Sequence, residues 1–113
     1  MPEFGSDFGS VLSIPKRLSK EETIRAMRFF VAAEFEAVQL YMKIAEASDD
    51  PLIKAQLTKI ADEERVHAGE FLRLLYYLDP KEKGFYSEGF GEVEDTMNQA
   101  KAKGYKIILE DED

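Results

Sequence analysis

Two long segments of this chain repeat their residues at alternating intervals of three and four, and this pattern restricts the fold more than any other feature. Such spacing places side chains on one face of an α-helix and is typical of helices that pack into bundles. We therefore expect an all-α fold in which two helices pack through these stripes. The first stripe is Ile24, Met27, Val31, Glu34, Val38, Tyr41 and Ala45. The second stripe is Ile53, Leu57, Ile60, Glu64, His67, Phe71, Leu74 and Leu78.

Local signals predict where the two helices begin and end. Ser19 followed three residues later by Glu22 is a capping box, which starts a helix. Asp50 before Pro51 starts the second helix, because proline is tolerated in a first turn, and Pro80 follows the end of that helix. The connection is short, so the helices should form an antiparallel hairpin. The predicted helices are Lys20–Ala47 and Pro51–Leu78.

The remaining segments carry weaker signals. Residues 1–18 contain Gly-Ser pairs and no periodicity, so we expect a flexible N-terminal lead. After Pro80, the glycine-rich stretch "KEKGFYSEGFG" predicts a loop, and Val93–Lys103 predicts a short third helix ended by Gly104. Residues 104–113 form an acidic tail. Residues 19–103 form the helical domain, because a chain of 113 residues has room for one domain only.

Composition excludes several functional classes. The net charge of −8 and the pI of about 4.7 argue against a nucleic-acid partner, which would require a basic surface. The absence of cysteine excludes disulfides, thiolate zinc sites and a cysteine nucleophile in this chain. No apolar run approaches the ~20 residues of a membrane span, and no signal peptide is apparent. A cytoplasmic protein is therefore expected.

Three ionisable residues interrupt the two apolar stripes near their centres: Glu34 in the first, and Glu64 with His67 in the second. A buried carboxylate without a partner costs several kcal/mol, so these groups require partners. Because the helices are antiparallel, the three groups should meet at one depth. We predict that Glu34, Glu64 and His67 bind a metal and act as the catalytic residues.

A simpler interpretation remains open, in which Glu64 and His67 hydrogen-bond each other and Glu34 reaches the surface. The nearby acidic residues lie off the stripes, and we interpret them as a solvated face. These residues are Asp62, Glu63 and Glu70.

The ligand set is half of a known arrangement. Di-iron four-helix bundles take one glutamate from each of two helices and a Glu-x-x-His from each of the other two. Two copies of this hairpin would supply the complete set, so we expect a homodimer. A second apolar stripe on the first helix must be covered by the C-terminal segment or by further subunits. It consists of Phe30, Ala33, Ala37, Leu40 and Ile44.

At these residues the chain resembles the encapsulated ferritins, in their archaeal-type branch. The segments that carry the resemblance are "AAEFEAVQLY", "ADEERVHAGEFL" and, more weakly, "LDPKEKGFYSEGFGEVED". The resemblance implies a metal-dependent dimer with a ferroxidase di-iron centre at its interface, assembled into ring-shaped decamers. By position it implies Glu34, Glu64 and His67 as ligands from each chain. Tyr41 matches a tyrosine near the family's centre, whereas Ala33 departs from its outer metal site and Glu36 matches it.

The expected chemistry is oxidation of Fe²⁺ by dioxygen, because carboxylate and imidazole ligands suit iron. The resemblance further implies iron storage with an encapsulin shell protein as partner, inside a nanocompartment. Two alternatives remain open. One is a rubrerythrin-like peroxide reductase, and the other is a non-catalytic helical assembly protein with a structural metal at the dimer axis.

Overall fold

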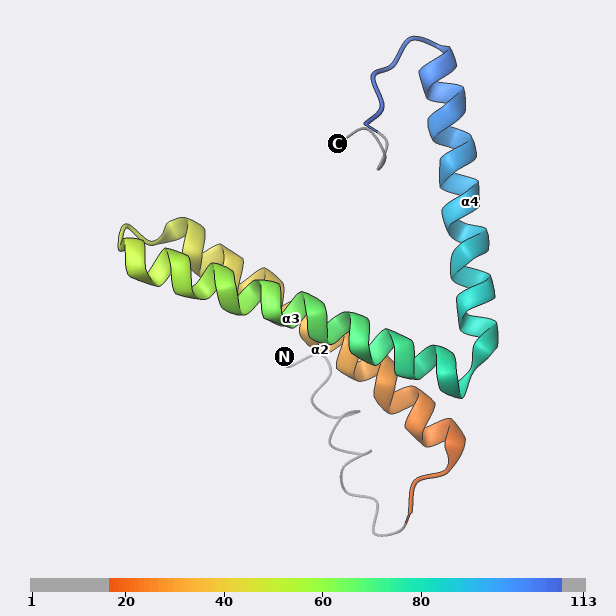
Figure 1. The fold of residues 1–113 in the computed structure, drawn as a ribbon, viewed down its shortest axis with the longest axis horizontal. Coiled ribbons are helices and arrows are strands. Elements are labelled where there is room, and N and C mark those ends of the chain that lie inside the picture. Colours follow the sequence, from red (N-terminus) through yellow and green to blue (C-terminus); the bar gives the residue numbers. More distant parts are fainter. Residues whose placement is uncertain (1–16, 109–113) are drawn as a thin grey trace. The chain divides into compact units, whose positions relative to one another are not determined.

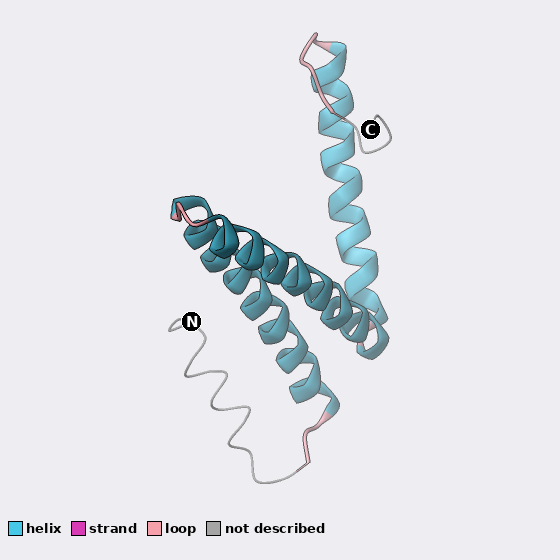
Figure 2. Cartoon of the chain, turned by 60° about the vertical axis from the view of Figure 1, so that its left-hand side comes forward, coloured by secondary structure: helices cyan, strands magenta, loops and turns pink. Residues whose placement is uncertain are grey.

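A computed structural model describes residues 17–108, and within this range the regular structure is entirely helical (Figure 2). The helices are α2 (Lys20–Ala47), α3 (Pro51–Leu78) and α4 (Pro80–Ala102), as labelled in Figure 1. The all-α class is confirmed, and the first two helices have the predicted bounds. Residues 1–16 and 109–113, which include most of the predicted lead and half of the predicted tail, lie outside the described range. No described helix combines the length and the apolar character that a membrane span requires.

The capping box at the start of α2 forms as the sequence predicts. The Ser19 hydroxyl accepts from the Glu22 backbone amide at 3.1 Å, and the Glu22 carboxylate accepts from the Ser19 amide at 2.8 Å. Two amides that an isolated helix end would leave without partners are thereby satisfied. The start of α2 is thus set by local chemistry.

The turn between α2 and α3 is held by the N-cap residue of α3 and by a lysine in the first turns of that helix. Asp50 accepts from two backbone amides in the first turn of α3, at 2.9 and 3.3 Å. The last turn of α2 contains no basic residue. Lys54 of α3 instead supplies a cation to the end of α2. Its ammonium donates to the carbonyl oxygens of Ala45 at 2.9 Å and Glu46 at 3.3 Å. A cation at a helix C-terminus is stabilising, so this lysine closes the hairpin.

The two long helices lie side by side and antiparallel in both views (Figures 1 and 2). Apart from Ala26, their buried side chains recur at intervals of seven residues, the spacing expected of a helical seam. Several of them are alanines, which let the two backbones approach closely. The buried residues of this seam are Val31, Val38 and Ala45 on α2, and Ala61, Ala68 and Leu75 on α3.

The predicted stripe of α2 is confirmed, but that of α3 is correct only at every second position. Leu57, Glu64 and Phe71 face α2 and are partly buried. Between them the seam uses alanine or leucine one residue later than predicted, since Ala61, Ala68 and Leu75 are buried. The bulkier predicted residues lie beside the seam, and two of them are well exposed. Exposure is 42% for Ile53 and 48% for Leu74.

The C-terminal prediction was wrong in its first half. Helix α4 begins at Pro80, so the segment predicted as a loop is helical, and the third helix is not short. Proline is well suited to a first turn, and the Tyr86 hydroxyl donates to the Glu82 carboxylate one turn away. Each of the three glycines costs about 1 kcal/mol relative to alanine, and this cost does not break the helix.

The end of α4 follows the prediction closely. Gly104 has a φ of +95°, and the amides of Gly104 and Tyr105 bond back to Lys101 and Ala100 at 3.0 and 3.1 Å. This is a Schellman motif, in which glycine is favoured because it has no Cβ. No residue of α4 is buried. The parts of the chain before and after the Asp79–Pro80 bond form separate compact units.

Candidate metal centre

Helix α2 contributes Glu34, which lies near its middle. The neighbouring seam residues, Val31 and Val38, are buried, so the helix directs Glu34 toward α3. The side chain of Glu34 is only 18% exposed. A carboxylate is thus held at the edge of an apolar seam, where water cannot fully solvate it.

Helix α3 contributes Glu64 and His67, which lie one turn apart. Glu64 lies on the seam between Ala61 and Ala68, which are 0% and 4% exposed. Because alanine ends at Cβ, the helices approach closely enough for Glu34 and Glu64 to meet. His67 lies beside the seam, and half of its side chain remains exposed.

The structure brings all three predicted residues together. His67 Nδ1 lies 3.6 Å from Glu34 Oε2 and 3.7 Å from Glu64 Oε1. One ligand atom from each residue falls within 4.8 Å of the other two. These separations exceed the usual hydrogen-bond distance and leave room for an ion at the centre of the group.

The polar atoms of this group are incompletely satisfied. Glu34 Oε2 is buried and has no hydrogen-bond partner. Neither part of the simpler interpretation is observed, because Glu34 does not reach the surface and His67 lies too far from Glu64 for a normal hydrogen bond. A buried oxygen without a partner is uncommon in a folded protein, and a bound cation, a proton or a water molecule would satisfy it.

Electrostatics lead to the same conclusion. Burial raises the pKa of Glu34 above its ordinary value of 4.5, and the neighbouring Glu64 carboxyl group raises it further. His67 acts in the opposite direction and offsets only part of this effect. Two carboxyl groups in a partly buried site repel each other when both are ionised. A cation bound between them would relieve both the repulsion and the desolvation cost.

The donor set fits a divalent transition metal. Two carboxylates and one imidazole without sulfur suit Fe²⁺, Mn²⁺ or Zn²⁺. The resemblance also singled out three residues outside this ligand group. Tyr41, Glu36 and Ala33 are all partly buried. The neighbouring acidic residues Glu63 and Glu70 are exposed.

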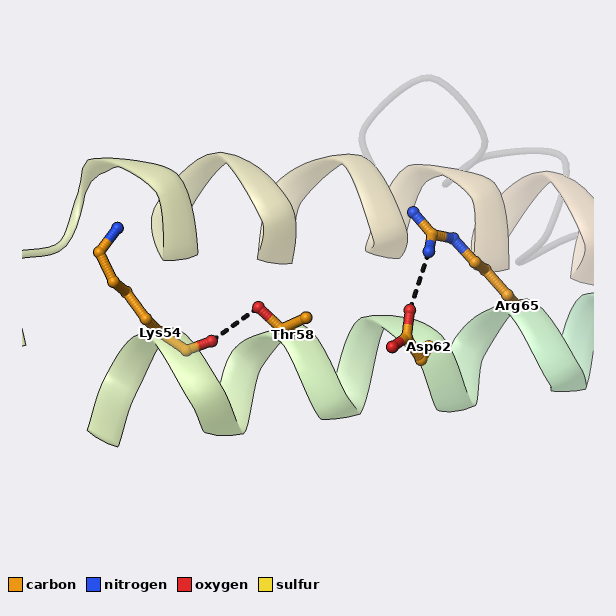
Figure 3. A network of polar contacts seen from close by, with 4 residues as sticks. All are labelled: Lys54, Thr58, Asp62 and Arg65. Carbon is orange, nitrogen blue, oxygen red and sulfur yellow. Dashed lines mark hydrogen bonds and ion pairs between the residues drawn. The ribbon is translucent and has the colours of Figure 1, made fainter. Parts of the chain in front are cut away.

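Asp62 is also outside the group. Its carboxylate accepts from the Arg65 guanidinium at 2.8 Å, and both side chains are about 60% exposed (Figure 3). The same view shows Thr58 donating to the Lys54 carbonyl along α3, at 2.7 Å. These are contacts within one helix, and the prediction that Asp62 belongs to a solvated face is confirmed.

We call Glu34, Glu64 and His67 together the metal group. The metal group opens on one face of the hairpin, which we call the His67 face. It consists of the residues that directly precede the buried seam positions. In an antiparallel helix pair, the residues that precede the contact positions lie on the same side of the pair in both helices. The two rows therefore form one face. Its members are Phe30, Ala37 and Ile44 on α2, and Ile60, His67 and Leu74 on α3.

The two flanks of the hairpin differ in character. The His67 face is apolar apart from the histidine, and Ile44 and Leu74 are each 48% exposed. The residues that directly follow the same seam positions are mostly polar or small, and they form the opposite flank. They are Ala32, Gln39 and Glu46 on α2, and Asp62, Gly69 and Tyr76 on α3.

A ring pair beside the site was not predicted as part of it. Phe30 and Phe71 meet across the hairpin, with ring centroids 5.0 Å apart and planes inclined by 45°. Both residues belonged to apolar stripes in the sequence. Their spacing of four residues from Glu34 and His67 was the signal that could have linked them to the metal group.

Comparison with known proteins places the chain in a family. The model of the rubrerythrin family matches residues 26–107. A ferritin-like-encapsulin shell fusion protein of Pyrococcus furiosus is 35% identical over 86 residues, which cover 76% of this chain and 25% of that protein. The encapsulin nanocompartment cargo protein EncC of Myxococcus xanthus is 35% identical over 75 residues, which cover 66% of this chain and 58% of that protein.

A solved structure gives the same result. The encapsulated ferritin domain from Pyrococcus furiosus matches with a TM-score of 0.71 and 36% identity, covering 74% of this chain and 85% of that one. This chain spans only part of the two curated relatives, but it covers most of that domain. The chain therefore belongs to the rubrerythrin family, on the encapsulated-ferritin branch of the ferritin-like proteins.

Proposed function

We propose that two copies of this chain form a ferroxidase that oxidises Fe²⁺ to Fe³⁺ with dioxygen. Glu34, Glu64 and His67 of each copy would bind the ferrous substrate at a centre shared between the two chains. The observation that carries the proposal is the convergence of these three side chains around a buried Glu34 oxygen without a partner. Bound ferrous ions supply the electrons that reduce dioxygen, one from each ion.

The protein's own groups have distinct tasks in this scheme. Glu34 and Glu64 supply anionic oxygens, and two copies supply four carboxylates that balance the charge of two Fe²⁺ ions. His67 would bind as a neutral imidazole, which requires a free lone pair on one ring nitrogen. The apolar seam on either side limits access of water to the ions.

The His67 face supports the expectation of a dimer. A metal group with three side chains leaves coordination positions open, and it lies on an apolar face of the hairpin. Burying this face against its copy would remove apolar surface from water and bring two half-sites together. The opposite flank offers less apolar surface, so it is the weaker candidate for this contact.

The relatives support a cellular setting. One is named as a fusion with an encapsulin shell and the other as an encapsulin nanocompartment cargo protein. We infer that this chain also works with an encapsulin shell, inside a nanocompartment, and contributes to iron storage there. A larger ring of dimers, such as a decamer, would follow if further apolar surface pairs between dimers.

Peroxide reduction is the second candidate, because the matching family model is that of rubrerythrin. This chain contains no cysteine with which to hold a rubredoxin-type iron centre. A zinc or calcium site with a purely structural role is the non-catalytic alternative.

Aerobic titration with Fe²⁺, followed by the absorbance of Fe³⁺, separates these functions. A ferroxidase should oxidise iron faster than buffer does, at a rate that depends on dioxygen. A peroxide reductase would instead oxidise ferrous iron much faster with peroxide under anaerobic conditions. If neither oxidant gives a rate above buffer while the protein still binds metal, the structural-metal alternative is correct.

A further inference from the structure

The Phe30–Phe71 ring pair lies directly beside the metal group. Phe30 precedes Glu34 by four residues, and Phe71 follows His67 by four residues. Because the helices are antiparallel, Phe30 and Phe71 are both shifted from the metal group in the same direction. The shift is about 6 Å along the hairpin. The rings therefore close the end of the site that lies toward the start of α2.

The polar groups of the site are connected only by long ion pairs, which exceed hydrogen-bond distance. The distances from His67 Nδ1 to the two carboxylates are 3.6 and 3.7 Å, and Glu34 Oε2 has no hydrogen-bond partner. Like charges on the two glutamates favour separation of the helices at this level. The position of Glu34 relative to His67 must therefore come largely from packing.

The adjacent seam residues supply only part of that packing. Ala61 and Ala68 allow the backbones to approach, but a methyl group offers little resistance to sliding along the axis. Two inclined rings with centroids 5.0 Å apart offer more, because a slide of one residue displaces them by about 1.5 Å. Aromatic pairs are also worth about 0.5–1.5 kcal/mol beyond the area they bury.

We propose that Phe30 and Phe71 are positioning residues of the metal centre: their contact sets the register of α2 against α3 and thereby holds Glu34 within reach of Glu64 and His67. This inference rests on the proposed metal site, but it does not depend on which reaction the site performs. The rings touch no reacting atom in this scheme. Their effect is on metal affinity and coordination geometry.

Binding of Co²⁺ to the metal-free full chain tests this inference, because the visible absorption spectrum of Co²⁺ reports its coordination. We expect Phe30→Leu and Phe71→Leu each to weaken Co²⁺ binding about 10-fold and to change the spectrum, by analogy with other groups that orient metal ligands. The double variant should be no weaker than either single variant, since both remove one contact. Phe71→Tyr keeps the ring and should restore affinity.

Leu57→Ala is the matched control. Leu57 lies on the same stripe of α3, seven residues before Glu64, and is also partly buried. We expect this variant to lower the melting temperature at least as much as Phe71→Leu while leaving the Co²⁺ affinity and spectrum unchanged. Native mass spectrometry at each Co²⁺ concentration separates loss of dimer from loss of affinity.

Several outcomes would overturn the inference. It is wrong if both leucine variants bind Co²⁺ as the parent does, if their effects add fully, or if Leu57→Ala weakens binding equally. If a leucine variant does not fold, Phe71→Met provides the same comparison with an unbranched, more adaptable apolar side chain. Failure of the proposed reaction is distinguishable, because a parent that binds Co²⁺ but oxidises no iron would refute the ferroxidase and leave the positioning role intact.

Discussion

At the scale of single residues, His67 distinguishes the proposed metal site from an ordinary pair of carboxylates. His67→Ala removes the only nitrogen donor of the metal group. We expect the initial rate of aerobic Fe²⁺ oxidation to fall at least 10–100-fold, because even the loss of groups that only orient ligands costs that much. Thr58→Ala, which alters an exposed residue of the same helix, is the control and should oxidise iron at the parent rate.

The raised pKa of Glu34 gives a second prediction at this scale. A carboxyl group whose pKa is higher in the folded state favours folding when it is protonated, and this contribution is lost as the pH rises through that pKa. The metal-free protein should therefore gain stability, as far as Glu34 is concerned, as the pH falls from neutral toward 4.5.

Glu34→Gln tests this assignment by thermal unfolding without metal. At neutral pH the variant should melt a few degrees above the parent, since about 1 kcal/mol moves Tm by ~4–8 °C in a domain of this size. The difference should shrink at pH 4.5 and reverse when Co²⁺ is added, because the parent then has its cation. A variant that melts below the parent at pH 7 without metal would contradict the assignment.

At the scale of elements, α4 is a helix that sequence propensity alone disfavours. A Cβ built at Gly84, Gly89 or Gly91 meets no atom within 4 Å, so alanine fits at each position. We expect Gly89→Ala to stabilise α4 by about 1 kcal/mol relative to its uncoiled state. Hydrogen exchange of the amides between residues 80 and 102 should slow accordingly, while exchange in α2 and α3 stays unchanged.

The matched variant for α4 is Gly104→Ala, which makes the same substitution at a position where φ is +95°. That conformation disfavours any residue with a Cβ, so the end of α4 should fray and its amides should exchange faster. Equal effects of the two substitutions would show that the glycine positions of α4 are not as described.

At the scale of the whole molecule, metal and the His67 face should control association. Adding Fe²⁺ or Co²⁺ neutralises the carboxylates, so native mass spectrometry should show monomer converted to dimer or larger rings. Leu74→Glu places a charge on the His67 face and should leave a folded monomer in the presence of metal. Gln39→Glu is the control, because Gln39 is exposed and lies on the opposite flank. A monomer that persists in the parent at saturating metal would argue against a shared site.

The sequence by itself determined the two long helices, their antiparallel connection and the three ionisable side chains that meet between them. These features follow from local chemistry: the Ser19–Glu22 box, the Asp50 cap and the placement of Glu34, Glu64 and His67 within periodic stripes. Such signals act within one or two helical turns, so no knowledge of distant contacts is needed to interpret them.

Tertiary structure decided which residues form the seam of α3 and which side chains flank the site. The apolar pattern permits two neighbouring faces. Bulk alone favours Ile60 over Ala61 and does not distinguish Leu74 from Leu75. The close approach of α2 selects the alanines and turns the larger side chains and His67 outward. The Phe30–Phe71 contact is likewise a matter of register between helices, which no periodicity within one helix contains.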